Sequence, residues 1–150
     1  MLFMDSDDAM KSYLLRPEVA GGMGPSTELD ATVHPPMVRR LHYEFAGWLG
    51  NDIAETFPCI IVTERLGDAL VRSGVMGFEL DDVLVTKDPQ FEELFPEEAA
   101  ALPAWRWLRL DAVAGGGDMW QDAAASLHVN EKALTVLRAF RLEACEVVEE

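Results

Sequence analysis

The chain has 150 residues, of which 49% are hydrophobic and 26% charged, a composition typical of one globular domain rather than of a disordered chain. Its 27 acidic residues outnumber 12 Lys and Arg, which leaves a formal net charge of -15 at pH 7. Because such a charge repels phosphate, we expect no direct DNA or RNA binding. An acidic surface either keeps a protein soluble or steers it toward a basic protein partner.

The cysteines and the N-terminus indicate a cellular compartment. Cys59 and Cys145 both lie in apolar runs and form no C-x-x-C pair, so neither a disulfide framework nor a zinc site is expected, while one bridge between them stays open. Asp5, Asp7 and Asp8 stand where a secretory signal would carry Lys or Arg, and no apolar run approaches the length of a membrane span. We therefore expect a cytoplasmic protein that does not enter a membrane.

The expected domain occupies residues 11–150, after a disordered acidic stretch at residues 1–10. It begins with a short strand at residues 13–15. Residues 17–36 are rich in glycine and proline and predict a long surface loop, a kind of loop that often carries function. Residues 38–49 then alternate apolar and polar side chains, as a strand with one buried face does.

The next segment predicts a helical turn, a central strand and a helix. Asn51 or Asp52 can cap a short helical turn at residues 51–55. Residues 59–62 form an apolar, β-branched run typical of a buried strand. At Thr63 the period of the apolar residues changes to that of a helix, and Thr63 is its expected N-cap.

The rest of the chain continues the alternation of strands and helices. The expected elements are a strand pair or a bent strand at residues 78–86, an acidic helical turn at 91–95, a strand at 105–110, a mobile connection at 114–118, a short strand at 126–129, a helix capped by Asn130 and a last strand at 142–148. This mixed order favours a single α+β domain, with a mixed or antiparallel sheet and a few short helices, over regular βαβ winding.

Two stretches of the chain resemble each other at a joint between strand and helix. Residues 62–64 read Val-Thr-Glu and residues 129–131 read Val-Asn-Glu, and apolar residues follow at helical spacing in both. In each, a valine ends the strand, Thr or Asn caps the helix, and an acid lies at the positive helix start. A duplicated strand-helix-strand unit explains this likeness, and chance similarity of two such joints is the alternative.

The same segments carry a family resemblance. Residues 57–66 (FPCIIVTERL) and 74–80 (GVMGFEL) are similar to a family of bacterial immunity proteins encoded beside polymorphic toxins. In that family a Val-Ser-Glu-Arg-Leu pattern opens a helix, and Gly-x-x-Gly-Phe-Glu leads into the next strand. Thr63 replaces the usual serine and preserves capping. The resemblance covers about half of the chain, implies a cytoplasmic protein that binds a toxin domain, and supplies no catalytic residues.

Residues suited to catalysis do not form a recognisable site. His34, His42 and His128 have no metal-ligand spacing, and His42 is better interpreted as a hydrogen-bonded strand residue than as an acid/base partner of Glu44. Motifs for a nucleophile elbow, a phosphate loop or dinucleotide binding are missing from the sequence. Cys59 lies in an apolar strand, without the exposed, electropositive setting of a reactive thiol. We therefore predict a protein that is not an enzyme and has no cofactor or metal.

Acidic residues are densest in residues 79–98, where Lys87 is the only base. The plain interpretation is a solvated surface, and the functional one is a docking surface for a basic protein with an aromatic anchor. Among the aromatic candidates, which include Phe91 and the four tryptophans, we expect Trp120 to be the most exposed tryptophan. The predicted partner-binding residues are Asp81, Asp82, Asp88, Glu92, Glu93, Phe95, Glu97, Glu98 and Trp120.

Two functions that are not enzymatic are consistent with this pattern. The first is an immunity protein that neutralises a cognate basic toxin domain by stoichiometric binding, as the family resemblance implies. The alternative is a regulatory or scaffold module that binds another basic protein.

Overall fold

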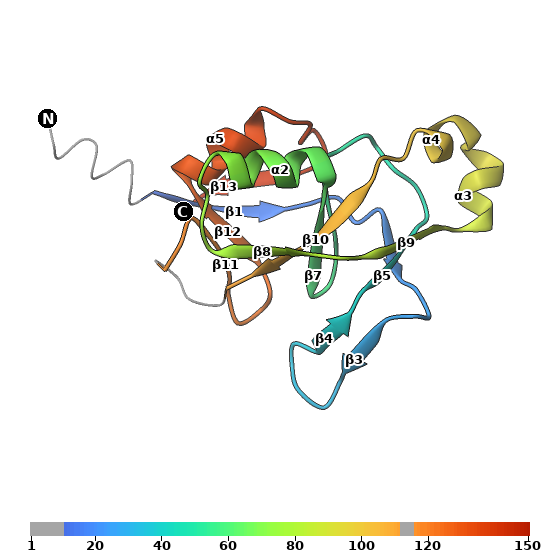
Figure 1. The fold of residues 1–150 in the computed structure, drawn as a ribbon, viewed down its shortest axis with the longest axis horizontal. Coiled ribbons are helices and arrows are strands. Elements are labelled where there is room, and N and C mark those ends of the chain that lie inside the picture. Colours follow the sequence, from blue (N-terminus) through green and yellow to red (C-terminus); the bar gives the residue numbers. More distant parts are fainter. Residues whose placement is uncertain (1–10, 112–115) are drawn as a thin grey trace, which may run out of the picture.

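The computed structural model describes residues 11–111 and 116–150, and these form a single α+β domain, as the order of elements predicts. Figure 1 shows helices α2 (Glu64–Arg72) and α5 (Glu131–Arg138) side by side, whereas α3 (Pro89–Leu94) and α4 (Pro96–Ala100) lie at the opposite end of the molecule. The predicted disordered stretch at residues 1–10 lies outside the described residues, as does part of the connection expected at 114–118.

One four-stranded antiparallel sheet has the order β6-β7-β10-β8. Its strands are β6 (Ile53–Thr56), β7 (Cys59–Thr63), β10 (Trp105–Leu110) and β8 (Phe78–Asp81). The strand β7 is buried along its whole length, which confirms the expected central strand. The helix α2 follows it directly, and the Thr63 hydroxyl caps that helix by accepting a hydrogen bond from Leu66 N at 3.3 Å.

The other four-stranded sheet repeats this arrangement, with the order β11-β12-β1-β13. Its strands are β11 (Met119–Gln121), β12 (Leu127–Asn130), β1 (Ser12–Arg16) and β13 (Glu146–Glu149). All of its pairings are antiparallel. The helix α5 follows β12, and Asn130 Oδ1 caps it by accepting from Ala133 N at 3.0 Å. Both predicted N-caps are therefore confirmed.

The two halves of the chain exchange their first strands. One half runs β1-β6-β7-α2-β8 and the other runs β10-β11-β12-α5-β13. In each, a hairpin feeds a helix and a last strand follows that helix, but the opening strand lies in the sheet of the other half. Thus β1 lies between β12 and β13, and β10 lies between β7 and β8. The register corresponds too, with Thr63 opposite Trp105 and Asn130 opposite Ser12, which favours a duplicated unit over chance similarity.

Asp52, the residue before β6, connects the two halves. Its backbone carbonyl accepts from Thr63 N at 2.9 Å, so it supports the cap of its own helix. Its backbone N–H donates to Arg141 O at 2.9 Å, and its Oδ2 accepts from Arg141 N at 3.0 Å. Because Arg141 follows α5, Asp52 joins the start of one helix to the segment that leaves the other.

Asp118, the residue before β11, makes the corresponding contacts in the other half. Its carbonyl accepts from Asn130 N at 2.9 Å, its N–H donates to Met76 O at 2.8 Å, and its Oδ2 accepts from Met76 N at 2.8 Å. Since Met76 follows α2, each aspartate links the start of one helix to the segment that leaves the other helix. The duplication therefore extends from the order of the elements to individual hydrogen bonds.

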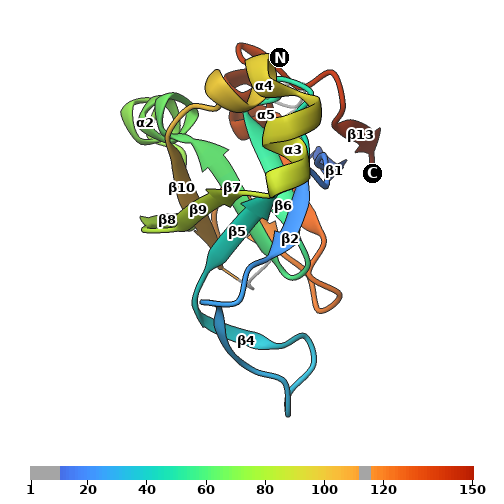
Figure 2. The same ribbon diagram turned by 90° about the vertical axis from the view of Figure 1, so that its right-hand side faces the viewer.

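Two segments have no counterpart in the repeat and together form what we call the inserted module. It contains β2 (Gly21–Met23), β3 (Glu28–Asp30), β4 (Met37–Arg40), β5 (His42–Phe45), β9 (Leu84–Lys87), α3 and α4. The strand β5 is central in a small sheet, antiparallel to β2 and parallel to β9. Figure 2 shows the β3–β4 hairpin extending away from the body of the molecule, while α3 and α4 lie at the other end of this module.

The inserted module packs on the first sheet through aromatic side chains. Tyr43 and Phe45 of β5 are fully buried, and the ring of Phe45 lies 5.2 Å from that of Trp105 on β10. Trp105 and Trp107 are buried in the core of this module, whereas Leu108 on the other face of β10 lies in a different core. A separate core fills the space between the two repeated sheets and the helices α2 and α5.

Several local predictions are wrong, among them the single strand at residues 38–49, which is divided into β4 and β5 in different sheets. Residues 51–55 form no helical turn, because Ile53–Thr56 is the strand β6 and the side chains of Asn51 and Asp52 bind partners far along the chain. The expected loop at residues 17–36 contains β2 and β3. Gly21 lies so close to β5 that a Cβ atom there would be 1.9 Å from Glu44 O, so this glycine serves strand pairing. The last strand begins at Glu146, four residues later than expected.

The helix caps give a first testable prediction. Thr63→Ala should lower the free energy of unfolding by about 2 kcal/mol, because it removes both the cap and a donor to Asp52. Asn130→Ala should cost about 1 kcal/mol through its cap. Urea denaturation measures both, with Thr63→Ser as the variant that keeps the hydroxyl. Equal stability of Thr63→Ala and the original protein would contradict the assigned role.

Candidate partner-binding site

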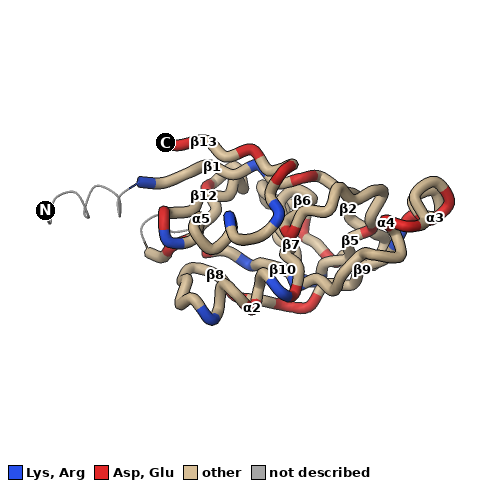
Figure 3. Tube along the Cα trace, turned by 90° about the horizontal axis from the view of Figure 1, so that it is seen from above, with Lys and Arg blue, Asp and Glu red and all other residues tan. Residues whose placement is uncertain are grey.

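Glutamates gather on α3 and α4. Glu92 and Glu93 lie on α3, Glu97 and Glu98 on α4, and all four are exposed. Within the described residues none of them has a cation within 4.0 Å. Figure 3 shows acidic residues gathered at this end of the molecule. Asp88 has a structural part, since its Oδ1 accepts from Gln90 N at 2.8 Å and caps α3.

The two acids at the end of β8, Asp81 and Asp82, are used within the fold. Asp81 Oδ2 lies 3.0 Å from Arg109 Nη1, and Asp82 Oδ1 lies 3.8 Å from Arg106 Nη2. A hydrogen bond from Asp82 N and the Arg109 guanidinium both hold the pKa of Asp81 below its usual value. Asp81 and Asp82 therefore neutralise the arginines of β10, and the structure does not join them to the glutamates of α3 and α4.

The aromatic candidates separate into buried and exposed side chains. Phe91 is 1% exposed and packs α3 against the core, so it cannot contact a partner. Phe95 is 50% exposed and its neighbour Leu94 is 67% exposed, both beside the glutamates in sequence. Trp120 lies on β11, far from α3 in Figure 1, and it is half-buried rather than exposed as expected, as is Trp48.

His128 explains the position of Trp120. The His128 ring stacks on Trp120 with centroids 5.6 Å apart, and its two nitrogens lie 2.7 Å from Asp122 Oδ2 and Glu150 Oε1. Burial lowers the pKa of His128, but the hydrogen bonds to the two carboxylates outweigh burial and raise it overall. This cluster ties the C-terminal residue to the β11–β12 turn.

Trp48 belongs to a surface that the sequence did not single out. Together with Leu49 it lines two adjoining hollows on the inserted module. One hollow, of about 470 Å³, which we call the Trp48 hollow, is lined by Trp48, Leu49, Gly50, Glu97, Glu98, Ala101 and Arg141. The other, of about 390 Å³, adds Glu18 and Val19 to the same two residues. Glu97 and Glu98 thus lie beside an indole ring contributed by a segment about fifty residues earlier in the chain.

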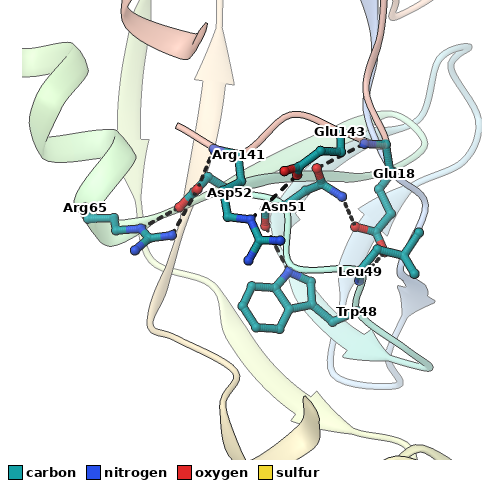
Figure 4. Close-up of polar contacts among 9 residues, drawn as sticks. Glu18, Trp48, Leu49, Asn51, Asp52, Arg65, Arg141 and Glu143 are labelled. Atoms are coloured by element: carbon teal, nitrogen blue, oxygen red, sulfur yellow. Dashed lines mark hydrogen bonds and ion pairs between the residues drawn. The ribbon is translucent and has the colours of Figure 1, made fainter. Parts of the chain in front are cut away.

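Hydrogen bonds hold the segment that carries Trp48, as Figure 4 shows. Trp48 Nε1 donates to Asn51 O at 2.9 Å, and Leu49 N donates to Glu18 Oε2 at 3.0 Å. The buried Asn51 side chain donates from Nδ2 to Glu18 Oε1 at 3.0 Å and accepts from Ala144 N at 3.1 Å. These hydrogen bonds therefore hold residues 48–51 to Glu18 on one side and to Ala144 on the other.

Asp52 continues this network inward. Its buried carboxylate accepts from Arg65 Nε at 2.7 Å, from Arg65 Nη2 at 3.0 Å and from the Thr63 hydroxyl at 2.6 Å. Burial alone would raise the pKa of Asp52, but these bonds and the one from Arg141 N hold it below its usual value. The pKa of Arg65 is raised in turn, chiefly by its hydrogen bonds to Asp52. The charged form of both side chains is thus favoured.

The groups considered for chemistry have structural environments. His42 is buried, with Nε2 at 2.7 Å from the Thr86 hydroxyl and Nδ1 accepting from Ser26 N at 3.2 Å. Both cysteines are free, and burial raises the pKa of Cys59 to about 12, so its thiol is neutral. In the described part of the chain, no three His, Cys, Asp or Glu side chains are grouped as metal ligands.

Another hollow, of about 500 Å³, lies between the β3–β4 hairpin and the strand β10. Its apolar wall includes Val33, Pro36 and Met37, and Arg109 also lines it, with its guanidinium 4.4 Å from the ring centre of Trp107.

Over residues 11–111 and 116–150, no helix has the length and apolar character needed to cross a membrane.

Comparison with protein-family models gives no match for this chain, and comparison with curated proteins gives none either.

The buried Asp52 gives a second prediction. Because its pKa is depressed in the folded state, its contribution to stability is present above the unfolded pKa of about 3.9 and is lost as pH falls through the folded value. Asp52→Asn should lower the free energy of unfolding by about 3 kcal/mol at pH 7. The difference from the original protein should shrink below about pH 4.

Urea denaturation between pH 2 and pH 8 provides this measurement. Asp68→Asn is the matched control, because Asp68 is exposed on α2. A constant difference between Asp52→Asn and the original protein across that range would show that the carboxylate charge does not contribute.

Proposed function

We propose that this protein is an immunity protein, which binds a basic toxin domain stoichiometrically and has no enzymatic activity of its own. One observation carries the proposal: the exposed apolar residues Leu94 and Phe95 are flanked by four glutamates without ion pairs in the described residues. The family resemblance of residues 57–66 and 74–80 supplies the toxin as the kind of partner. A reducing cytoplasm suits the two free cysteines.

The distribution of ion pairs supports a function for these glutamates. Arg65, Arg106 and Arg109 all face carboxylates within the fold, whereas residues 88–101 contain no Lys or Arg. Like charges close together repel each other and oppose folding. A cationic partner would remove this repulsion on binding, because it would supply the positive charge that residues 88–101 lack.

The apolar pair supplies an anchor. Leu94 and Phe95 lie at the junction of α3 and α4, with Phe91 buried one turn earlier as their support. Binding energy at protein interfaces concentrates in a few such side chains, surrounded by polar residues that set association rate and orientation. The apolar pair and the surrounding glutamates therefore match the two parts of such an interface, an apolar anchor and a charged rim.

A regulatory or scaffold module for another basic protein would use the same surface. The neighbouring gene distinguishes the two. Co-expression with the product of an adjacent toxin gene, followed by co-purification at one-to-one stoichiometry, supports immunity. Failure to bind that product, together with no protection of the host cell from it, would overturn it.

Charge reversal gives a third prediction. Glu92→Lys with Glu93→Lys should lower the rate constant for association with the adjacent toxin domain by about tenfold at low salt, because opposite charge steers the encounter. The effect should shrink at high salt through screening. A matched control, Asp68→Lys with Asp111→Lys, changes the net charge equally at exposed positions away from α3 and α4. Equal rates for the two double variants would place the interface elsewhere.

Truncating the anchor gives a fourth prediction. Phe95→Ala should mainly raise the dissociation rate constant, corresponding to about 2 kcal/mol if the ring fills a pocket of the toxin domain. Surface plasmon resonance measures this, and Val71→Ala on α2 is the control because Val71 is similarly exposed. An unchanged dissociation rate for Phe95→Ala would remove Phe95 from the interface.

A further inference from the structure

We propose that the Trp48 hollow is a receptor for one Lys or Arg side chain of the partner. The inference rests on the proposed function for the source of that side chain, but the binding chemistry belongs to the hollow itself. The hollow lies where the segment that carries Trp48, the helix α4 and the chain after α5 meet.

The lining matches a long cationic side chain. Trp48, Leu49 and Ala101 offer apolar surface to a methylene stem, and an indole also attracts a cation over its face. Glu97 and Glu98 lie in the same wall, exposed and without an ion pair in the described residues. Apolar surface beside carboxylates favours neither a purely apolar group nor an anion, but it suits an alkyl chain that ends in a positive charge.

The hollow is formed before a ligand arrives. Trp48 is held by its hydrogen bond to Asn51 O and by an edge-to-face contact with Trp105, with rings 6.3 Å apart at 82°. On the opposite wall, the buried Ala99 packs α4 onto the core. Rigid walls reduce the entropy lost on binding, so one side chain can add affinity here.

Arg141, the base in the lining, does not neutralise these two glutamates. Its Nε lies 3.6 Å from Glu143 Oε2, and its guanidinium is close to Gly50, where a Cβ atom would be 3.1 Å from the Arg141 Cζ. Glu97, Glu98 and Glu143 therefore outnumber it, and the local charge is negative. Arg141 also shows that a guanidinium fits against this part of the surface.

Titration of the full-length protein with Nα-acetyl-arginine amide and Nα-acetyl-lysine amide tests the inference without the toxin. The readout is the Trp48 indole N–H signal in NMR, assigned with Trp48→Phe. We expect a saturable shift with both amides and none with Nα-acetyl-norleucine amide, which lacks the charge. Either the absence of a saturable shift with the cations or an equal shift with norleucine amide would overturn the inference.

Two variants locate the binding site. Glu97→Gln with Glu98→Gln should weaken binding of the arginine amide by about fivefold, while α4 stays folded. The matched control, Glu92→Gln with Glu93→Gln, removes the same charge from α3 and should change the affinity by less than about twofold. Equal weakening in the two double variants would mean general charge attraction and would overturn a defined receptor.

The same variants separate this inference from the proposed function. If Glu97→Gln with Glu98→Gln binds the toxin domain as tightly as the original protein does, the receptor inference fails and immunity stands. If the arginine amide binds as expected while the adjacent toxin domain does not bind at all, the hollow is a cation receptor and immunity is the part that fails.

Discussion

The carboxylate of Asp52 is the interaction on which most of the structure depends. It is completely buried, and it satisfies the Thr63 hydroxyl, the Arg65 guanidinium and the Arg141 backbone at once. A buried charge is costly unless every lone pair has a donor, so this site stabilises only one arrangement of the three segments. Asp118, which is partly exposed, makes corresponding hydrogen bonds to Asn130 and Met76 in the other half.

The inserted module carries the surface that we propose for binding. The repeated halves bury their apolar faces on each other, and their arginines largely pair with neighbouring acids. The inserted module contributes a second core around Tyr43 and Phe45, and it leaves α3 and α4 exposed with glutamates in excess. The hydrogen bonds of Asp52 and Asp118 that join the two halves and the proposed binding surface on α3 and α4 thus lie in different parts of one domain.

The junction at Asp52 and the surface around Trp48 are nevertheless connected. Asn51 stands next to Asp52, and its carbonyl accepts a hydrogen bond from Trp48 Nε1. Its side chain donates to Glu18 and accepts from Ala144 N in the chain after α5. The position of the Trp48 ring therefore depends on the same junction that joins the two halves. Under the proposed function, an ordered Trp48 ring would lose less entropy on binding than a side chain on a mobile loop.

The sequence alone determined the features that depend on neighbours close in the chain: the apolar strand β7 and the caps Thr63 and Asn130. It also located the acids of α3 and α4. Only the tertiary structure decided which acids are free, because Asp81 meets Arg109 28 residues away, and why residues 51–55 are not helical, because Asn51 bonds Ala144 93 residues away. Periodicity carries no information on such distant partners, so the exchanged strands, the buried Phe91 and the Trp48 hollow came from packing.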